Sequence, residues 1–208
     1  RLEADPEKIK ELADQRMEIN WSFRLFLKSS DLSTRRIDSI VHRHYREVAA
    51  RIDCRQCANC CKSVQALLTD KDIERLAVKL GISREQVIDE YLQTSGGEEG
   101  YSFRSIPCPF LRGNLCAVYS HRPSVCRSYP HLQKKDFVSR TIQVYANCSV
   151  CPIVFNVYEL LKAEIGGEGD GERDVGFKTA SAICGAGAGI SGHGKEIPLF
   201  RTSPHRAA

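Results

Sequence analysis

The sequence predicts a mainly α-helical protein with short irregular β strands, forming a small single domain organised around a cysteine and metal cluster. Three observations predict this fold class. Apolar residues recur every three or four positions in several stretches, as in amphipathic helices. Four prolines between positions 107 and 130 prevent long regular elements there. Nine of the ten cysteines lie between Cys54 and Cys151. A chain of 208 residues, 42% of them hydrophobic, can bury a core without disulfide staples.

Residues 1–53 are predicted to form an N-terminal helical segment. Pro6 is placed to begin a first helix after Asp5, with apolar residues at helical spacing as far as Met17. Residues 20–30 are expected to be a partly buried connection. Either Asp31 or Ser33 then caps a helix whose apolar face reaches position 52.

Two capping boxes predict two helices after the cysteine-rich stretch that begins at position 54. Thr69 with Asp72 opens a helix over 69–80, which ends at Gly81, and Ser83 opens a second helix over 83–93. Further on, Gly113 lies in a tight turn between two short strands. The alternation over 137–145 predicts another strand, and a last helix begins at 152 and ends near 165. We therefore expect a cysteine-cluster metal-binding domain over residues 54–165.

Residues 166–208 are expected to be a flexible glycine-rich tail, because ten of the 15 glycines fall there and large apolar residues are few. Cys184 lies in this tail, and we do not expect it to be a ligand.

Composition excludes several classes of function. The net charge is only +4 and no block is strongly basic, so we expect no nucleic-acid partner. No run of 18 apolar residues occurs, so we expect no membrane span. The first sixteen residues are charged and do not resemble a secretory signal. We therefore expect a cytoplasmic protein, in which dense cysteine indicates metal binding or redox chemistry rather than disulfides.

The strongest motif is the cysteine run, which is defined here as Cys54, Cys57, Cys60 and Cys61. Its C-x2-C-x2-C spacing matches part of a cubane iron–sulfur pattern, which needs a remote fourth cysteine, often before proline. Cys108-Pro109 and Cys151-Pro152 both qualify. A zinc site would take any four thiolates instead, so spacing leaves both metals open.

Remote ligands are expected from Cys108, Cys116, Cys126 and Cys151. Adjacent Cys60 and Cys61 point their side chains in different directions on any ordinary backbone. At least one member of the run should therefore serve a different metal or remain free.

Three further residues are candidates for roles at the site. Cys148 forms a C-x2-C pair with Cys151 at the entrance of the last helix, where the helix dipole would favour the thiolate. Arg122 and Arg127 flank Cys126 and are candidate cofactor-binding residues, since a guanidinium offsets thiolate charge or binds a carboxylate or phosphate. Surface ion pairing is the alternative for both arginines. The candidate metal ligands are Cys54, Cys57, Cys60, Cys61, Cys108, Cys116, Cys126, Cys148 and Cys151.

The pattern C-x2-C-x2-CC followed by C-P-F-L, C-x-V-Y and R-P-x-x-C-R-x-Y-P resembles the YkgJ-type cysteine-cluster family over about residues 54–165. The resemblance implies a domain that chelates zinc or iron and gives no assigned reaction. A related branch, the flagellin lysine methylases, carries a similar cluster in a larger protein. This chain shows no separate S-adenosylmethionine domain.

Two functions follow as hypotheses. The first is a metal-binding protein that holds zinc or iron, including a [4Fe-4S] cluster, for metal carriage, sensing or support of a surface for a protein partner. The alternative is an iron–sulfur or metal-dependent enzyme that modifies a protein or small molecule, such as a methylase-related activity. A closed four-thiolate site favours the first, and an open position beside Arg122 or Arg127 favours the second.

Overall fold

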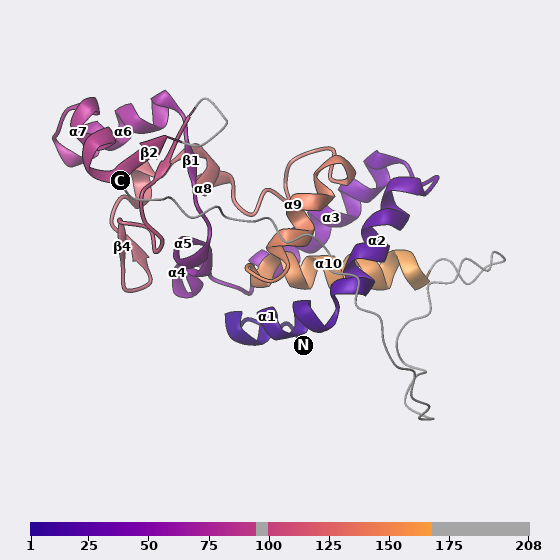
Figure 1. The fold of residues 1–208 in the computed structure, drawn as a ribbon. Coiled ribbons are helices and arrows are strands. Elements are labelled where there is room, and N and C mark those ends of the chain that lie inside the picture. Colours follow the sequence, from indigo (N-terminus) through magenta and orange to yellow (C-terminus); the bar gives the residue numbers. More distant parts are fainter. Residues whose placement is uncertain (95–99, 168–208) are drawn as a thin grey trace, which may run out of the picture. The chain divides into compact units, whose positions relative to one another are not determined.

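The structure is a computed structural model that describes residues 1–94 and 100–167 (Figure 1). Helices dominate these residues and the strands are short, which confirms the predicted mainly helical class with short strands. Cys184 and residues 168–208 of the predicted tail lie outside the described residues. In chain order, the elements are α1 (Pro6–Gln15), α2 (Met17–Ser29), α3 (Thr34–Ala49), α4 (Cys54–Cys57), α5 (Asn59–Ser63), β1 (Leu67–Leu68), α6 (Asp70–Leu80), α7 (Arg84–Tyr91), β2 (Leu92–Thr94), β3 (Tyr101–Phe103), β4 (Leu111–Arg112), β5 (Leu115–Cys116), η1 (Tyr119–His121), α8 (Ser124–Ser128), η2 (Val138–Arg140), α9 (Thr141–Asn147) and α10 (Pro152–Gly167).

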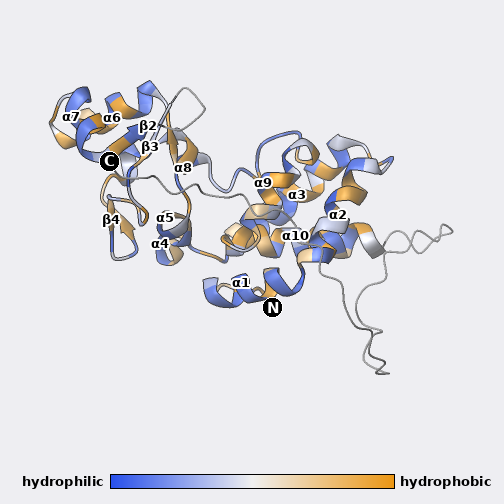
Figure 2. Cartoon of the chain, viewed as in Figure 1, coloured by the Kyte–Doolittle hydropathy of each residue, from blue (hydrophilic) through white to orange (hydrophobic). Residues whose placement is uncertain are grey.

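Helix α10 is the centre of the helical core. It packs along α3 and also contacts α1 and α9. Its first turns are almost entirely buried, and the Tyr158 ring meets Phe23 of α2 edge to face at a centroid distance of 5.3 Å. The Tyr158 hydroxyl donates a hydrogen bond to the Asn20 carbonyl at 3.1 Å. Hydrophobic and hydrophilic residues alternate along α2, α3 and α9, as expected of helices that bury one face (Figure 2).

The connection predicted over residues 20–30 is wrong, because these residues form most of helix α2. The helix buries Asn20, Phe23 and Leu27, which are three and four positions apart. Trp21 and Leu25 remain exposed on another face. Apolar residues on more than one face hid the helical period in the sequence.

The strand predicted over residues 137–145 is also wrong, because they form η2 and α9. Thr141 and Val144 are buried, which is a helical spacing. A residue that is distant in sequence fixes the start of η2. The Asp38 carboxylate of α3 accepts hydrogen bonds from the backbone N–H groups of Asp136 and Phe137, both at 2.9 Å. Local alternation could not reveal this contact, which spans 98 residues in the first case.

A second core lies under α6 and α7, and its buried residues are Leu68, Ile73, Leu76, Ala77, Val87, Leu92, Phe103, Phe110 and Val118. Both predicted capping boxes are present, and Gly81 ends α6 at a φ of 69°. Strands β1 and β2 flank β3 in an antiparallel sheet. The predicted turn at Gly113 joins β4 to β5, where Leu111 pairs with Cys116.

Within the described ranges, every helix is too short or too polar to cross a bilayer.

Candidate metal centre

The cysteine run does not form one continuous helix. Asp53 caps α4 by accepting a hydrogen bond from the Arg55 N–H at 2.9 Å. Ala58 then adopts a left-handed conformation, with a φ of 50°, and separates α4 from α5. This break changes the chain direction between Cys57 and Cys60, so the four side chains cannot follow one helical face.

Two hydrogen bonds join the cysteine run to remote cysteines. The Cys108 N–H donates to the Cys61 carbonyl at 2.8 Å. The Asn59 side chain donates to the carbonyl of Val150, also at 2.8 Å, which places the next residue, Cys151, beside α5. The sequence offered both Cys-Pro pairs as equal candidates, and the structure brings Cys108 to Cys61 and Cys151 near Asn59 of α5.

The other two remote cysteines, Cys116 and Cys126, lie on β5 and α8. The Asn114 side chain fixes the β4–β5 turn by donating to a backbone carbonyl of α4 at 2.8 Å, and this places Cys116. Cys126 lies in α8, whose first residue, Ser124, donates its N–H and hydroxyl to the Asp72 carboxylate at 2.9 and 3.0 Å. Asp72 therefore does more than cap α6, because it also holds the helix that carries Cys126. Sequence analysis assigned Asp72 to the cap alone.

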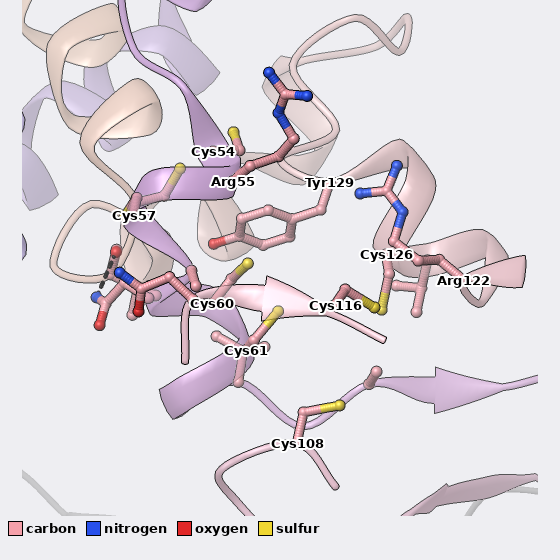
Figure 3. Close-up of a pocket in the computed structure, with 18 of the residues that line it drawn as sticks. Cys54, Arg55, Cys57, Cys60, Cys61, Cys108, Cys116, Arg122, Cys126 and Tyr129 are labelled. Atoms are coloured by element: carbon pink, nitrogen blue, oxygen red, sulfur yellow. Dashed lines mark hydrogen bonds between the residues drawn. The ribbon is translucent and has the colours of Figure 1, made fainter. Parts of the chain in front are cut away.

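Eight cysteines line one pocket of about 380 Å³ (Figure 3). They are Cys54, Cys57, Cys60, Cys61, Cys108, Cys116, Cys126 and Cys151. Cys54 is exposed, Cys151 is buried and the other six are intermediate. All are free thiols, and the lining contributed by the described residues contains neither a carboxylate nor an imidazole. The structure thus gathers eight of the nine predicted ligands.

Cys148 is the exception, because it does not line this pocket. It is buried directly after α9 rather than at the start of α10, and burial raises the pKa of its thiol. The expected lowering of this pKa by a helix dipole is therefore wrong: desolvation outweighs the opposing charge of Lys162.

Burial makes most thiols of the pocket harder to ionise. It raises the pKa of Cys108 to about 11 and those of Cys126 and Cys151 to about 12. The expectation that the adjacent Cys60 and Cys61 side chains diverge is wrong, because the Cys60 thiol hydrogen-bonds to Cys61. This hydrogen bond raises the pKa of Cys60 and lowers that of Cys61. Most of these groups are neutral thiols at pH 7, and a metal must displace their protons on binding.

Arg122 lines the pocket and Arg127 does not. The Arg122 guanidinium lies over the Tyr119 ring at 3.8 Å, and its Nε donates to the Tyr119 carbonyl at 3.1 Å. Among the described residues no carboxylate forms an ion pair with it. Its charge instead opposes the raised pKa of Cys54, Cys116 and Cys126. Of the two candidate cofactor-binding arginines, the structure places only Arg122 beside the thiols.

Tyr129 is a pocket residue to which sequence analysis gave no role of its own. Its hydroxyl donates to the Asn147 side chain at 2.9 Å. Burial, followed by the nearby thiols Cys151 and Cys60, raises its pKa. The motif R-P-x-x-C-R-x-Y-P was the only signal in the sequence that could have marked this ring.

The donor set fits zinc or iron, because thiolates are the ligands that both metals take in cysteine-rich sites. In the part of the chain that the structure describes, no three His, Cys, Asp or Glu side chains are grouped closely enough to hold a metal ion as they stand. Rotation about χ1 redirects each sulfur without moving the backbone. The pocket therefore supplies the ligands, and binding would require their side chains to converge.

This fold and pocket define a helical, cysteine-rich domain with the donor set of a thiolate metal site. Residues 53–152 match the CxxCxxCC family, whose description is "Putative zinc- or iron-chelating domain". The matched range contains the run, the remote cysteines and Arg122. No curated protein and no solved structure matches the chain.

Proposed function

We propose that this protein binds zinc or iron through the cysteine thiolates of the pocket. One observation carries the proposal: eight cysteines from separate chain segments line a single pocket in which the described residues provide no carboxylate or imidazole. The segments are anchored to one another by hydrogen bonds that involve Asn59, Cys61 and Asp72. Thiols that bind no ligand would give no physical reason to bring eight cysteines from separate segments into one pocket.

An iron–sulfur cluster is the more specific form of the proposal. The pattern C-x2-C-x2-C with a remote Cys-Pro is typical of cubane clusters, and Cys151-Pro152 lines the same pocket as Cys54, Cys57 and Cys60. Metal carriage, sensing and support of a surface for a protein partner are the roles that this proposal leaves for experiment.

Anaerobic purification followed by metal analysis and an absorption spectrum tests the proposal. Broad absorbance near ~400 nm together with iron and acid-labile sulfide would identify an iron–sulfur cluster. A colourless protein with stoichiometric zinc would identify a zinc site. Protein that binds neither metal, even after incubation with Zn²⁺ or with Fe²⁺ and sulfide, would refute the proposal.

A metal-dependent enzyme is the second candidate, and Arg122 is the observation that favours it. This guanidinium lines the pocket with no carboxylate partner among the described residues, as expected of a group that binds an anionic substrate. If so, inorganic phosphate or succinate should raise the melting temperature of the metal-loaded protein, and Arg122→Gln should abolish that rise. No rise with either anion would remove the support for this candidate.

A further inference from the structure

We infer that one face of α2 binds the same face of α2 in a second copy of this chain, with the two helices antiparallel. This face is called the α2 ridge and is defined as Met17, Trp21 and Leu25 with the flanking charges Glu18 and Arg24. The inference does not depend on the proposed metal binding, because no residue of α2 lines the cysteine pocket.

The α2 ridge gathers apolar side chains that the described part of the protein leaves uncovered. Met17, Trp21 and Leu25 follow one another at intervals of four residues, so they lie on one side of the helix. Their exposed fractions are 52%, 41% and 49%, whereas Phe23 and Leu27 on another side of α2 are buried. Neighbouring exposed apolar side chains are typical of an interaction surface.

Helix α9 extends this apolar surface. It packs beside α2, and the Tyr145 ring meets the Trp21 ring edge to face at a centroid distance of 5.4 Å. Ile142 lies three residues before Tyr145, on the same side of α9, and is 42% exposed. The exposed apolar surface therefore continues from α2 onto a second helix.

The residues of the α2 ridge are arranged symmetrically about Trp21. Glu18 precedes Trp21 by three residues and Arg24 follows it by three. Met17 and Leu25 lie four residues before and after it. When two α2 helices meet antiparallel about a two-fold axis at Trp21, Glu18 of each copy lies opposite Arg24 of the other. The ridge is therefore complementary to itself in charge and in apolar surface, as a two-fold interface requires.

Glu18 and Arg24 have no ionic partner within the described residues of their own chain. The Arg24 guanidinium carbon lies 4.6 Å from the centroid of the Trp21 ring, and the Arg24 Nε is buried without a hydrogen bond. A buried polar group without a hydrogen bond is unfavourable. The Glu18 carboxylate of a second copy, placed beside this guanidinium, would supply the acceptor.

The balance of charge favours a second copy over a lipid surface. A helix that binds an anionic membrane carries many lysines and arginines beside its apolar face. Helix α2 instead has one carboxylate, Glu18, and two cations, Arg24 and Lys28. Because α2 has 13 residues, or about 20 Å of helix, the contact is small and the dimer should form reversibly in the micromolar range.

Sedimentation equilibrium of the full chain tests the inference, with a reductant present so that disulfide-linked dimers do not form. Wild-type protein should pass from monomer to dimer as its concentration rises. Glu18→Arg and Arg24→Glu should each raise the Kd of the dimer at least about tenfold, because each places like charges opposite one another at two symmetric contacts. The matched control Glu90→Arg, which reverses an exposed charge on α7, should leave the Kd unchanged.

An equimolar mixture of the two single variants shows whether the two positions meet across the interface. One variant then has arginine at both positions and the other has glutamate at both, so opposite charges face each other in every mixed dimer. Mixing should restore a Kd close to that of the wild type. Such recovery also shows that both variants are folded.

Fluorescence gives a second measurement on the wild-type protein, because Trp21 is its one tryptophan. Dimer formation should bury this ring and shift its emission to shorter wavelength. An unchanged spectrum in a sample that sedimentation shows to be dimeric would place the interface elsewhere and overturn the inference.

Three sedimentation results would also overturn it. They are a wild-type protein that stays monomeric up to about 1 mM, a dimer whose Kd neither charge reversal changes, and single variants that stay monomeric when mixed. If the monomer instead bound vesicles of phosphatidylglycerol, the ridge would be a lipid-binding face. Metal content should be the same in all these variants, so the proposed function stands or falls by its own test.

Discussion

Replacing Asp72 with asparagine should lower the free energy of unfolding by about 3 kcal/mol, since hydrogen bonds to a charged group contribute roughly 1.5–3 kcal/mol and several are weakened together. The side chain is fully buried. Its carboxylate accepts hydrogen bonds from Thr69 N–H at 3.0 Å and Thr69 hydroxyl at 2.8 Å, and from Ser124 N–H at 2.9 Å and Ser124 hydroxyl at 3.0 Å. Arg75 pairs with the same group. Asparagine has nearly the shape of aspartate, but its side-chain NH2 group faces the Thr69 and Ser124 donors and cannot accept their hydrogen bonds.

The stability that Asp72 contributes should decrease as the pH falls. Burial raises the pKa of this carboxyl, but hydrogen bonds from Thr69 and Ser124 outweigh it, and the net pKa lies below the ordinary value of 3.8. A depressed folded-state pKa gives stability that is present above the unfolded pKa and lost as pH falls through the folded one. The difference between wild type and Asp72→Asn should therefore be full near pH 7 and shrink below about pH 4.

Urea unfolding followed by circular dichroism measures this difference, with Asp70→Asn as the matched control. Asp70 lies in the same helix and pairs with Arg84 at 2.6 Å, but its side chain is 73% exposed. An exposed ion pair contributes little, so the control should lose less than about 1 kcal/mol. Any loss of bound metal at low pH affects both variants and therefore cancels when the two are compared. Equal destabilisation by the two substitutions, or a difference that stays constant down to pH 2, would refute this account of Asp72.

Three other outcomes are expected. Cys57→Ser combined with Cys60→Ser should remove metal from the pocket and lower the melting temperature markedly, because a structural metal supplies on the order of 10 kcal/mol of folding free energy; unchanged metal content would contradict this. Arg122→Gln should weaken Zn²⁺ binding by about fivefold in competition with a chelator, because a nearby unit charge contributes about 1 kcal/mol and this guanidinium opposes the raised pKa of Cys54, Cys116 and Cys126, whereas Arg112→Gln, outside the pocket lining, should not. Truncation after Gly167 should preserve metal content and melting temperature, and loss of either would show that the remaining residues are needed.

Local chemistry made several elements predictable. A capping box requires only Thr69 and Asp72, or Ser83 and Gln86, because its partners are three residues apart. Gly81 and Gly113 mark turns because their backbone φ values are positive and glycine has no Cβ to oppose them. The predicted strand at 137–145 failed because the contact with Asp38 that determines it is distant in sequence.

The sequence by itself determined the mainly helical class and named all eight cysteines that line the pocket, because thiol density and two-residue spacing are written in the order of residues. Only the tertiary structure decided that Cys148 does not line the pocket, that Arg122 does and Arg127 does not, and which residue of α5 each Cys-Pro pair lies beside. The physical reason is that two hydrogen bonds, from Asn59 to Val150 and from Cys108 to Cys61, connect segments that are far apart in the chain. Spacing within a segment carries no information about such contacts.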